Sequence, residues 1–295
     1  MTSASGGSVS VYDATSGALL DGSFITGLHS AGNVILSAGN IFIEDAGGIA
    51  EYNAGSGAAI NTNFISISGT IEGIGEQGDE FYVLHGPAGD EIVSTYNAST
   101  GTLIDANLIG DPPGATLVVN DNVLYISSTG AGQNYITEWN ATTGAYIGEI
   151  YAPDAVSMTA SGNYLYVTYG TFNGDLSVFN TTTGALVSGF SITGLSDVTQ
   201  LQVVGDVLYI TEANGTVLEY NAETGAFIKT VDSTLSAADG VALGNDYYQY
   251  NGYPDGIIPS EDPPVTTPEP ASFAFAAAVL AVCVFLRRRY KSSQV

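Results

Sequence analysis

The sequence is short of cysteine and histidine, the residues on which much nucleophilic and metal chemistry depends. Cys283 is the only cysteine, and it lies in an apolar stretch near the C-terminus, so the chain can form no intramolecular disulfide. The two histidines, His29 and His85, stand alone, whereas a zinc site needs three or four convergent ligands. We therefore expect a hydrophobic core without disulfides, no zinc site and no cysteine nucleophile.

Positive charge is equally scarce. The chain has 5 Lys and Arg residues against 30 Asp and Glu residues, which gives a formal net charge of −25. Lys229 is the only one of these cations that precedes residue 287. Because nucleic-acid binding needs a basic face, nucleic acid is excluded as a partner. An acidic surface of this kind keeps exported proteins soluble.

No catalytic or cofactor motif is visible. The sequence has no local signature of a serine-histidine-aspartate set. Its many aspartates form no Asp-x-Asp-x-Asp-Gly loop, so only the abundance of aspartate leaves calcium binding open. We predict no catalytic residue, no metal site, no cofactor and no enzymatic activity. The eighteen tyrosines are expected mainly to pack between sheets, with a sugar-binding platform as the alternative.

What the chain does have is a repeat. An aromatic residue is followed by Asn or Asp and, five positions after the aromatic residue, by Gly, and successive copies are 40, 44, 43, 40 and 41 residues apart. The aromatic residues are Tyr12, Tyr52, Tyr96, Trp139, Phe179 and Tyr220, and the glycines are Gly17, Gly57, Gly101, Gly144, Gly184 and Gly225. A period near 40 with short strands is typical of β-propeller blades.

The local pattern of each copy predicts a hairpin. Asn or Asp opens a turn through its side chain, and Gly takes a positive-φ position in the loop. A second hairpin precedes most copies, with a small turn before an apolar-aromatic strand, as in 205–210. Its last copy is Asn245-Asp246-Tyr247-Tyr248. Each blade is thus expected to contain an inner and an outer hairpin.

The order of the hairpins predicts how the ring closes. The chain begins with an outer hairpin over 8–25, and its body ends with an inner hairpin over 236–250. Paired, the two complete one blade and remove the exposed edges of an open sheet. We therefore predict an all-β fold, a six-bladed β-propeller closed by its N- and C-terminal hairpins, with seven blades as the alternative.

The repeat resembles the PQQ-type and related propeller repeats, in which a strand ends in an aromatic-Asp-x-x-Thr-Gly turn. The resemblance covers most of 8–250 and implies a propeller fold. The tryptophan that usually follows the Thr-Gly turn in quinoprotein repeats is absent, as in Gly101-Thr102-Leu103. Quinone binding is therefore not carried over.

The C-terminus has the features of a membrane anchor. Residues 271–286 are apolar or small apart from Ser272, and Arg287, Arg288 and Arg289 follow at once. A helix over 271–286 would rise about 24 Å, somewhat less than the ~30 Å hydrocarbon core. Because positive flanks stay in the cytoplasm, we expect a transmembrane helix with the body outside and 287–295 inside. A buried core helix is the alternative.

Pro268, Glu269 and Pro270, the apolar helix and Arg287 to Arg289 together resemble the PEP-CTERM sorting signal of exosortase substrates. These are exported proteins of bacteria that make extracellular polysaccharide. The resemblance implies an exosortase-type membrane peptidase as partner, loss of the helix, and transfer from the inner membrane to the cell surface or matrix. It also implies an N-terminal signal peptide. The first residues show none, so we expect the true start codon to lie upstream.

The predicted organisation is a propeller over 1–250, an extended proline- and acid-rich spacer over 251–267, and a sorting signal over 268–295. The expected function is that of an exported binding or scaffold protein at the cell surface or in the matrix, with extracellular polysaccharide as a candidate partner. One alternative is an exopolysaccharide-active glycosidase or lyase with paired carboxylates at the central channel. The other is a permanently anchored single-pass membrane protein.

Overall fold

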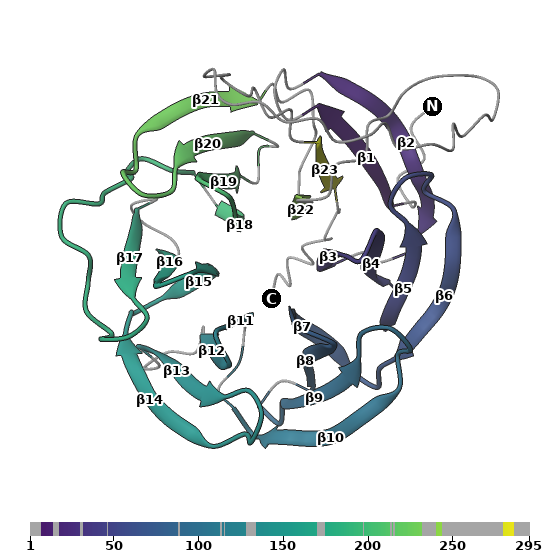
Figure 1. Ribbon diagram of the computed structural model, residues 1–295, viewed down its shortest axis with the longest axis horizontal. Coiled ribbons are helices and arrows are strands. Elements are labelled where there is room, and N and C mark those ends of the chain that lie inside the picture. The colour runs from purple at the N-terminus through teal and green to yellow at the C-terminus, as the bar shows by residue number, and fades with distance from the viewer. Residues whose placement is uncertain are drawn as a thin grey trace, which may run out of the picture.

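The described part of the chain consists of β-strands arranged in a ring of sheets (Figure 1). The computed structural model describes residues 7–13, 18–29, 32–45, 47–87, 89–112, 114, 116–127, 134–169, 175–196, 198–212, 214, 216–231, 240–243 and 280–285. All pairings between its strands are antiparallel. The predictions of an all-β fold and of a β-propeller are confirmed.

Five sheets are each built from one continuous stretch of chain, and we number them blades 1 to 5. Blade 1 has β3 (Val34–Ser37), β4 (Asn40–Asp45), β5 (Gly48–Asn53) and β6 (Ala59–Ser66). Blade 2 has β7 (Thr70–Gln77), β8 (Glu80–Gly86), β9 (Ile92–Asn97) and β10 (Leu103–Gly110). Blade 3 has β11 (Thr116–Asn120), β12 (Val123–Ser127), β13 (Tyr135–Asn140) and β14 (Tyr146–Tyr151).

Blade 4 has three strands, β15 (Ala155–Ser161), β16 (Tyr164–Tyr169) and β17 (Leu176–Asn180). Its outer segment pairs with β17 only through the bridges Leu176–Ile192 and Phe179–Leu186, so the expected fourth strand is not regular. Blade 5 has β18 (Val198–Val204), β19 (Val207–Glu212), β20 (Val217–Asn221) and β21 (Phe227–Val231).

A further sheet, the terminal sheet, brings together distant parts of the chain. Its order is β2 (Leu19–Leu28), β1 (Gly7–Asp13), β23 (Leu280–Phe285) and β22 (Gly240–Leu243). The N-terminal hairpin β1–β2 thus shares a sheet with β22, which lies within the predicted inner hairpin over 236–250.

The partner of β22 corrects that prediction. We expected β22 to pair with a strand near Tyr247, whereas the structure pairs it with β23 in the register Gly240–Val284 to Leu243–Ala281. Residues 244–250 lie outside the described part of the chain. The partner strand β23 comes from the C-terminal apolar stretch, for which a membrane helix was predicted.

Over Leu280–Phe285 the structure therefore has a strand and not the expected helix. A short apolar run is compatible with either element, because a strand covered on both faces needs no alternation of polar residues. In the described residues no helix is long and apolar enough to cross a membrane. The remaining residues of the predicted helix, 271–279 and Leu286, are outside the described ranges.

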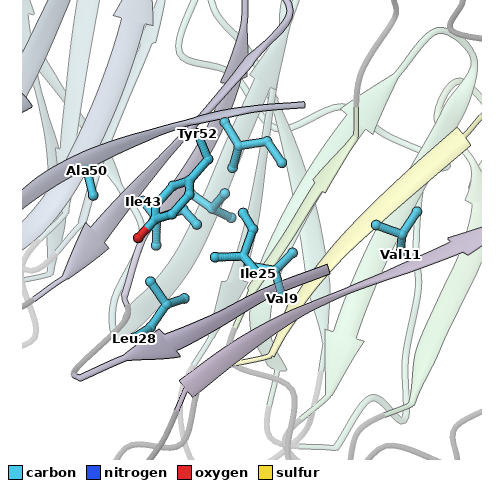
Figure 2. Packing of buried hydrophobic residues seen from close by; sticks show 9 residues of the cluster. Val9, Val11, Ile25, Leu28, Ile43, Ala50 and Tyr52 are labelled. Carbon is cyan, nitrogen blue, oxygen red and sulfur yellow. The ribbon is translucent and has the colours of Figure 1, made fainter. Parts of the chain in front are cut away.

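The core lies between neighbouring sheets. The second strand of each blade is buried on both faces, as in the run Leu124, Tyr125 and Ile126 of β12. Figure 2 shows one such layer, in which Val9 and Ile25 of the terminal sheet pack with a cluster that includes Ile43 of blade 1. Since every blade is covered by a neighbour on each side, apolar residues on both faces are buried.

Candidate functional site

The repeated turns are structural sites, and each is built in the same way. In blade 2, Asn97 Oδ1 accepts hydrogen bonds from Ser99 N at 3.1 Å and from Thr100 N and Oγ1 at 2.9 Å. Gly101 N donates to Asn97 O at 2.8 Å. The same Gly-to-Asn backbone bond recurs at Asn53, Asn140, Asn180 and Asn221. These asparagines therefore hold the hairpin between the two outer strands.

The turn glycines have positive φ angles, from +65° to +69° at Gly57, Gly101, Gly144, Gly184 and Gly225. Gly17 lies outside the described residues. The structure adds a second requirement that the sequence did not reveal. A Cβ on Gly57, Gly101 or Gly144 would overlap the backbone carbonyl oxygen of Phe24, Phe64 or Leu108, respectively, in the preceding sheet. Each of these glycines thus allows its blade to approach the preceding sheet closely.

The residues predicted for sorting are Pro268, Glu269 and Pro270, together with Arg287, Arg288 and Arg289. All six lie outside the residues that the structure describes. Their role stays a prediction from the sequence.

The inner strands were the expected place for a pair of catalytic carboxylates. Across β3, β7, β11, β15, β18 and β22, acidic residues occur only on β7, at Glu72 and Glu76. Both acids therefore lie on one strand of one blade, and the other described inner strands supply no second carboxylate.

Glu76 has a role between blades. The hydroxyl of Ser37 in blade 1 donates to its carboxylate. Burial raises the pKa of the Glu76 carboxyl, and the Ser37 hydrogen bond partly lowers it. The neighbouring Gln77 accepts a hydrogen bond from Asn122 N of blade 3 at 2.9 Å. Both side chains tie blade 2 to an adjacent blade.

The two histidines lie in different surroundings. His29 is exposed, and its Nδ1 lies 3.6 Å from a carboxylate oxygen of Asp45. His85 is buried, with its Nε2 2.8 Å from Ser94 Oγ. Because the Ser94 hydroxyl donates to Ala106 O at 2.8 Å, His85 Nε2 must donate to Ser94. Ser94 is thus held as part of the core, and the described residues contain no group of three or more potential metal ligands.

The burial of His85 gives a pH-dependent prediction. Burial lowers the pKa of the His85 imidazole from 6.5, and a backbone contact with Ser68 partly offsets this. Between pH 6.5 and the lower folded-state pKa, the unfolded chain binds a proton that the folded chain does not. The free energy of unfolding should therefore fall as pH falls through this window, by at most about 1.4 kcal/mol per pH unit.

Urea unfolding of wild type and His85→Gln between pH 7.5 and 5 measures this. Gln keeps a hydrogen-bonding group beside Ser94 but does not titrate, and all other charges are the same in both proteins. The difference in unfolding free energy between the two proteins should narrow or change sign as pH falls. A constant difference would mean that His85 has the same pKa in both states.

The only lysine or arginine of the repeats forms an ion pair within a blade. Lys229 Nζ lies 3.3 Å from Glu219 Oε1, across the β20–β21 pair. Burial raises the pKa of the Glu219 carboxyl, and the charge of Lys229 opposes this shift. Lys229 therefore stabilises a buried carboxylate, and the rest of the described propeller presents acidic and neutral groups.

The described tyrosines are buried, half-buried or exposed, and Tyr169 and Tyr220 are half-buried. Seven are buried between sheets, as expected from packing: Tyr12, Tyr52, Tyr82, Tyr96, Tyr125, Tyr166 and Tyr209. Tyr135, Tyr146, Tyr151 and Tyr164 are exposed, and the first three lie together on β13 and β14 of blade 3. The repeat pattern of the sequence does not single out this group of three. The feature of the sequence that could have identified these tyrosines is that blade 3 differs from the other repeats at their positions.

Comparison with known proteins indicates the fold alone. No protein-family profile matches the chain, and no characterised protein is close to it in sequence. Among solved structures, it is similar to hydrazine synthase of Kuenenia stuttgartiensis, with 15% identity, a TM-score of 0.50, and coverage of 71% of this chain and 67% of that one. It also matches the computationally designed protein Ika8, with 15% identity, a TM-score of 0.49, and coverage of 74% and 79%. A third match is BamB from Moraxella catarrhalis, with 18% identity, a TM-score of 0.44, and coverage of 81% and 76%.

Proposed function

We propose that this protein is an exported binding or scaffold protein of the bacterial cell surface or extracellular matrix, sorted through its C-terminal signal. The observation that carries the proposal is the order Pro268-Glu269-Pro270, apolar stretch, Arg287 to Arg289, placed after a propeller. The body is a rigid disc with an acidic surface, which suits a role outside the cell. Within the described inner strands, acidic residues occur only on β7, and this distribution favours scaffolding over the alternative of a glycosidase or lyase.

We propose further that the disc has six blades, with the terminal sheet completing the ring. The N-terminal hairpin β1–β2 already pairs with β23, and β23 with β22. If the chain starts upstream of Met1, a seventh blade is the alternative.

The apolar stretch 271–286 has two uses in this proposal. Before processing, it anchors the chain with Arg287 to Arg289 in the cytoplasm. The pairing of β23 with β1 shows that the same residues are also compatible with a strand. Cleavage near Pro268 to Pro270 removes β23, and the predicted hairpin over 236–250 then supplies the inner strands of the terminal sheet.

The test is the intact mass and cellular fraction of the native protein from its host. We expect a mass that ends near residue 270, in the medium or outer envelope. Alanine at Pro268, Glu269 and Pro270 should leave the unprocessed chain in the inner membrane. Alanine at Pro263 and Pro264, in the adjacent spacer, is the matched control and should not affect processing. A native chain that keeps Arg287 to Val295 in the inner membrane would instead support the permanently anchored alternative.

A further inference from the structure

One face of the outer hairpin β13–β14 carries an unusual set of aromatic side chains. Directly opposite residues of an antiparallel pair share a face. The opposite pairs here are Tyr135–Tyr151, Thr137–Glu149 and, beyond a β-bulge that keeps Tyr146 on the same face, Trp139–Tyr146. This face therefore presents four aromatic rings with a carboxylate between them, and we call Tyr135, Trp139, Tyr146, Glu149 and Tyr151 the aromatic strip.

The tyrosines of the strip are exposed to solvent, whereas Trp139 is half-buried and packs against the core between blades 2 and 3. Tyr135, Tyr146 and Tyr151 are 41%, 54% and 62% exposed. The opposite face of the same hairpin is not available for binding, because Ile136 and Ile150 are buried in the core shared with blade 4. The tyrosines of the strip are thus free of the packing role that tyrosines have elsewhere in the propeller.

The rings are held in fixed positions. Tyr135 and Tyr151 form an edge-to-face pair with centroids 5.4 Å apart, and Trp139 and Tyr146 form another at 5.3 Å. Trp139 Nε1 donates to Thr137 Oγ1 at 2.9 Å, and Tyr146 Oη donates to a carboxylate oxygen of Glu149 at 3.3 Å. A surface arranged in advance in this way loses little conformational entropy when a ligand binds.

Comparison between blades shows that the fold does not require the Tyr135–Tyr151 pair. The pair that corresponds to Tyr135 and Tyr151 is Ile92–Gly110 in blade 2 and Gly48–Ser66 in blade 1. Trp139 is the only tryptophan of the chain and replaces the Tyr or Phe of the other repeats. At the Tyr135–Tyr151 pair, blade 3 therefore carries large amphipathic side chains where blades 1 and 2 have small or aliphatic residues.

The chemistry of the strip suits an uncharged sugar chain. Aromatic faces pack against the apolar C–H faces of pyranose rings, while the tyrosine hydroxyls and Glu149 offer hydrogen bonds to sugar hydroxyls. An acidic ligand would meet Glu149 and a strongly negative molecule whose only cation before residue 287 is paired with Glu219. A purely apolar partner would leave the polar tips of the strip unpaired.

We propose that the aromatic strip is a binding site for an uncharged polysaccharide. The two ring pairs lie about 13 Å apart along β13, which allows more than one sugar to be bound at once. The inference rests on the proposed role at the cell surface and names the ligand class of that role.

The test is affinity electrophoresis of the full chain, in a detergent that contains no sugar, through gels that hold laminarin, hydroxyethylcellulose, dextran, galactomannan or the acidic polymer alginate. We expect retardation by at least one neutral polymer. Tyr135→Ala/Tyr151→Ala should raise the dissociation constant about tenfold or more, as truncated aromatic anchors do. Phe227→Ala is the matched control, because Tyr220 and Phe227 form a similar edge-to-face pair, at 5.4 Å, on the outer hairpin of blade 5. It should leave retardation unchanged.

The fluorescence of Trp139 gives a second readout that needs no variant. Since the chain has no other tryptophan, its emission reports on the strip directly and should change when the retarding polymer is added. The proposal is overturned if no neutral polymer retards the chain, if alginate alone does, if the double variant binds as wild type, or if the emission does not change. A chain that reaches the surface without binding sugar refutes this inference alone, whereas one that binds sugar but is not sorted refutes the proposed function.

Discussion

Replacing Gly144 by alanine is expected to lower the free energy of unfolding by about 3 kcal/mol. Its φ of +65° costs an alanine about 1–2 kcal/mol. The new methyl group would also overlap the carbonyl oxygen of Leu108 in blade 2. Because that oxygen belongs to the backbone, the two blades must separate slightly, which adds about 1–3 kcal/mol, as overpacking of a core does. Urea unfolding measures the change.

Gly162 provides the control for backbone strain alone. Its φ is +54°, but a Cβ there would meet nothing within 4 Å. Gly162→Ala should therefore cost only the conformational part, about 1–2 kcal/mol. Equal losses at Gly144 and Gly162 would show that the contact with Leu108 has no effect on stability.

Removing the ring of Phe81 should have an effect of similar or larger size. Phe81 is fully buried between blades 1 and 2, with its ring centroid 4.8 Å from that of Phe42 and 6.4 Å from that of Phe64. Phe81→Ala leaves a cavity whose lining comes from two blades and cannot collapse without moving one of them. We expect a loss of about 3–5 kcal/mol in the free energy of unfolding.

Phe227→Ala is again the appropriate comparison, since Phe227 is 57% exposed on the rim. It should cost less than about 1 kcal/mol, because little apolar area is taken from the core. If both substitutions cost the same, the interface between blades 1 and 2 does not contribute to stability as its packing suggests.

Much of the propeller could be predicted because its determinants are local. The spacing from Tyr96 to Gly101 specifies a turn that needs only its own Asn and Gly. The number of copies at a period near 40 residues gives the number of outer hairpins. The contact between Gly144 and Leu108 could not be predicted, because it depends on how far apart two blades sit. It explains why glycine occupies this position, and not asparagine, which tolerates a positive φ but carries a Cβ.

The closing strand and the aromatic strip escaped prediction for other reasons. Leu280–Phe285 is too short and too uniformly apolar for periodicity to distinguish strand from helix. The strip joins Tyr135 and Tyr151, sixteen positions apart, and its exposure depends on which face of β13 meets the neighbouring blade. The repeat alone placed these tyrosines on strands, where packing is the usual role of tyrosine.

The surroundings of the turn glycines also differ between blades 1 to 3 and blades 4 and 5. A Cβ on Gly57, Gly101 or Gly144 would overlap a backbone carbonyl oxygen, whereas a Cβ on Gly184 or Gly225 would meet only side-chain atoms, of Ile150 or Phe190, at ordinary contact distance. A side chain can change rotamer to let a blade move, but a backbone carbonyl in a strand cannot. Transient opening of the ring should therefore begin at blades 4 and 5, where the fourth strand of blade 4 is also incomplete. Gly144 lies between Trp139 and Tyr146 in the sequence. The aromatic strip is therefore expected to lie in the part of the propeller that opens less often.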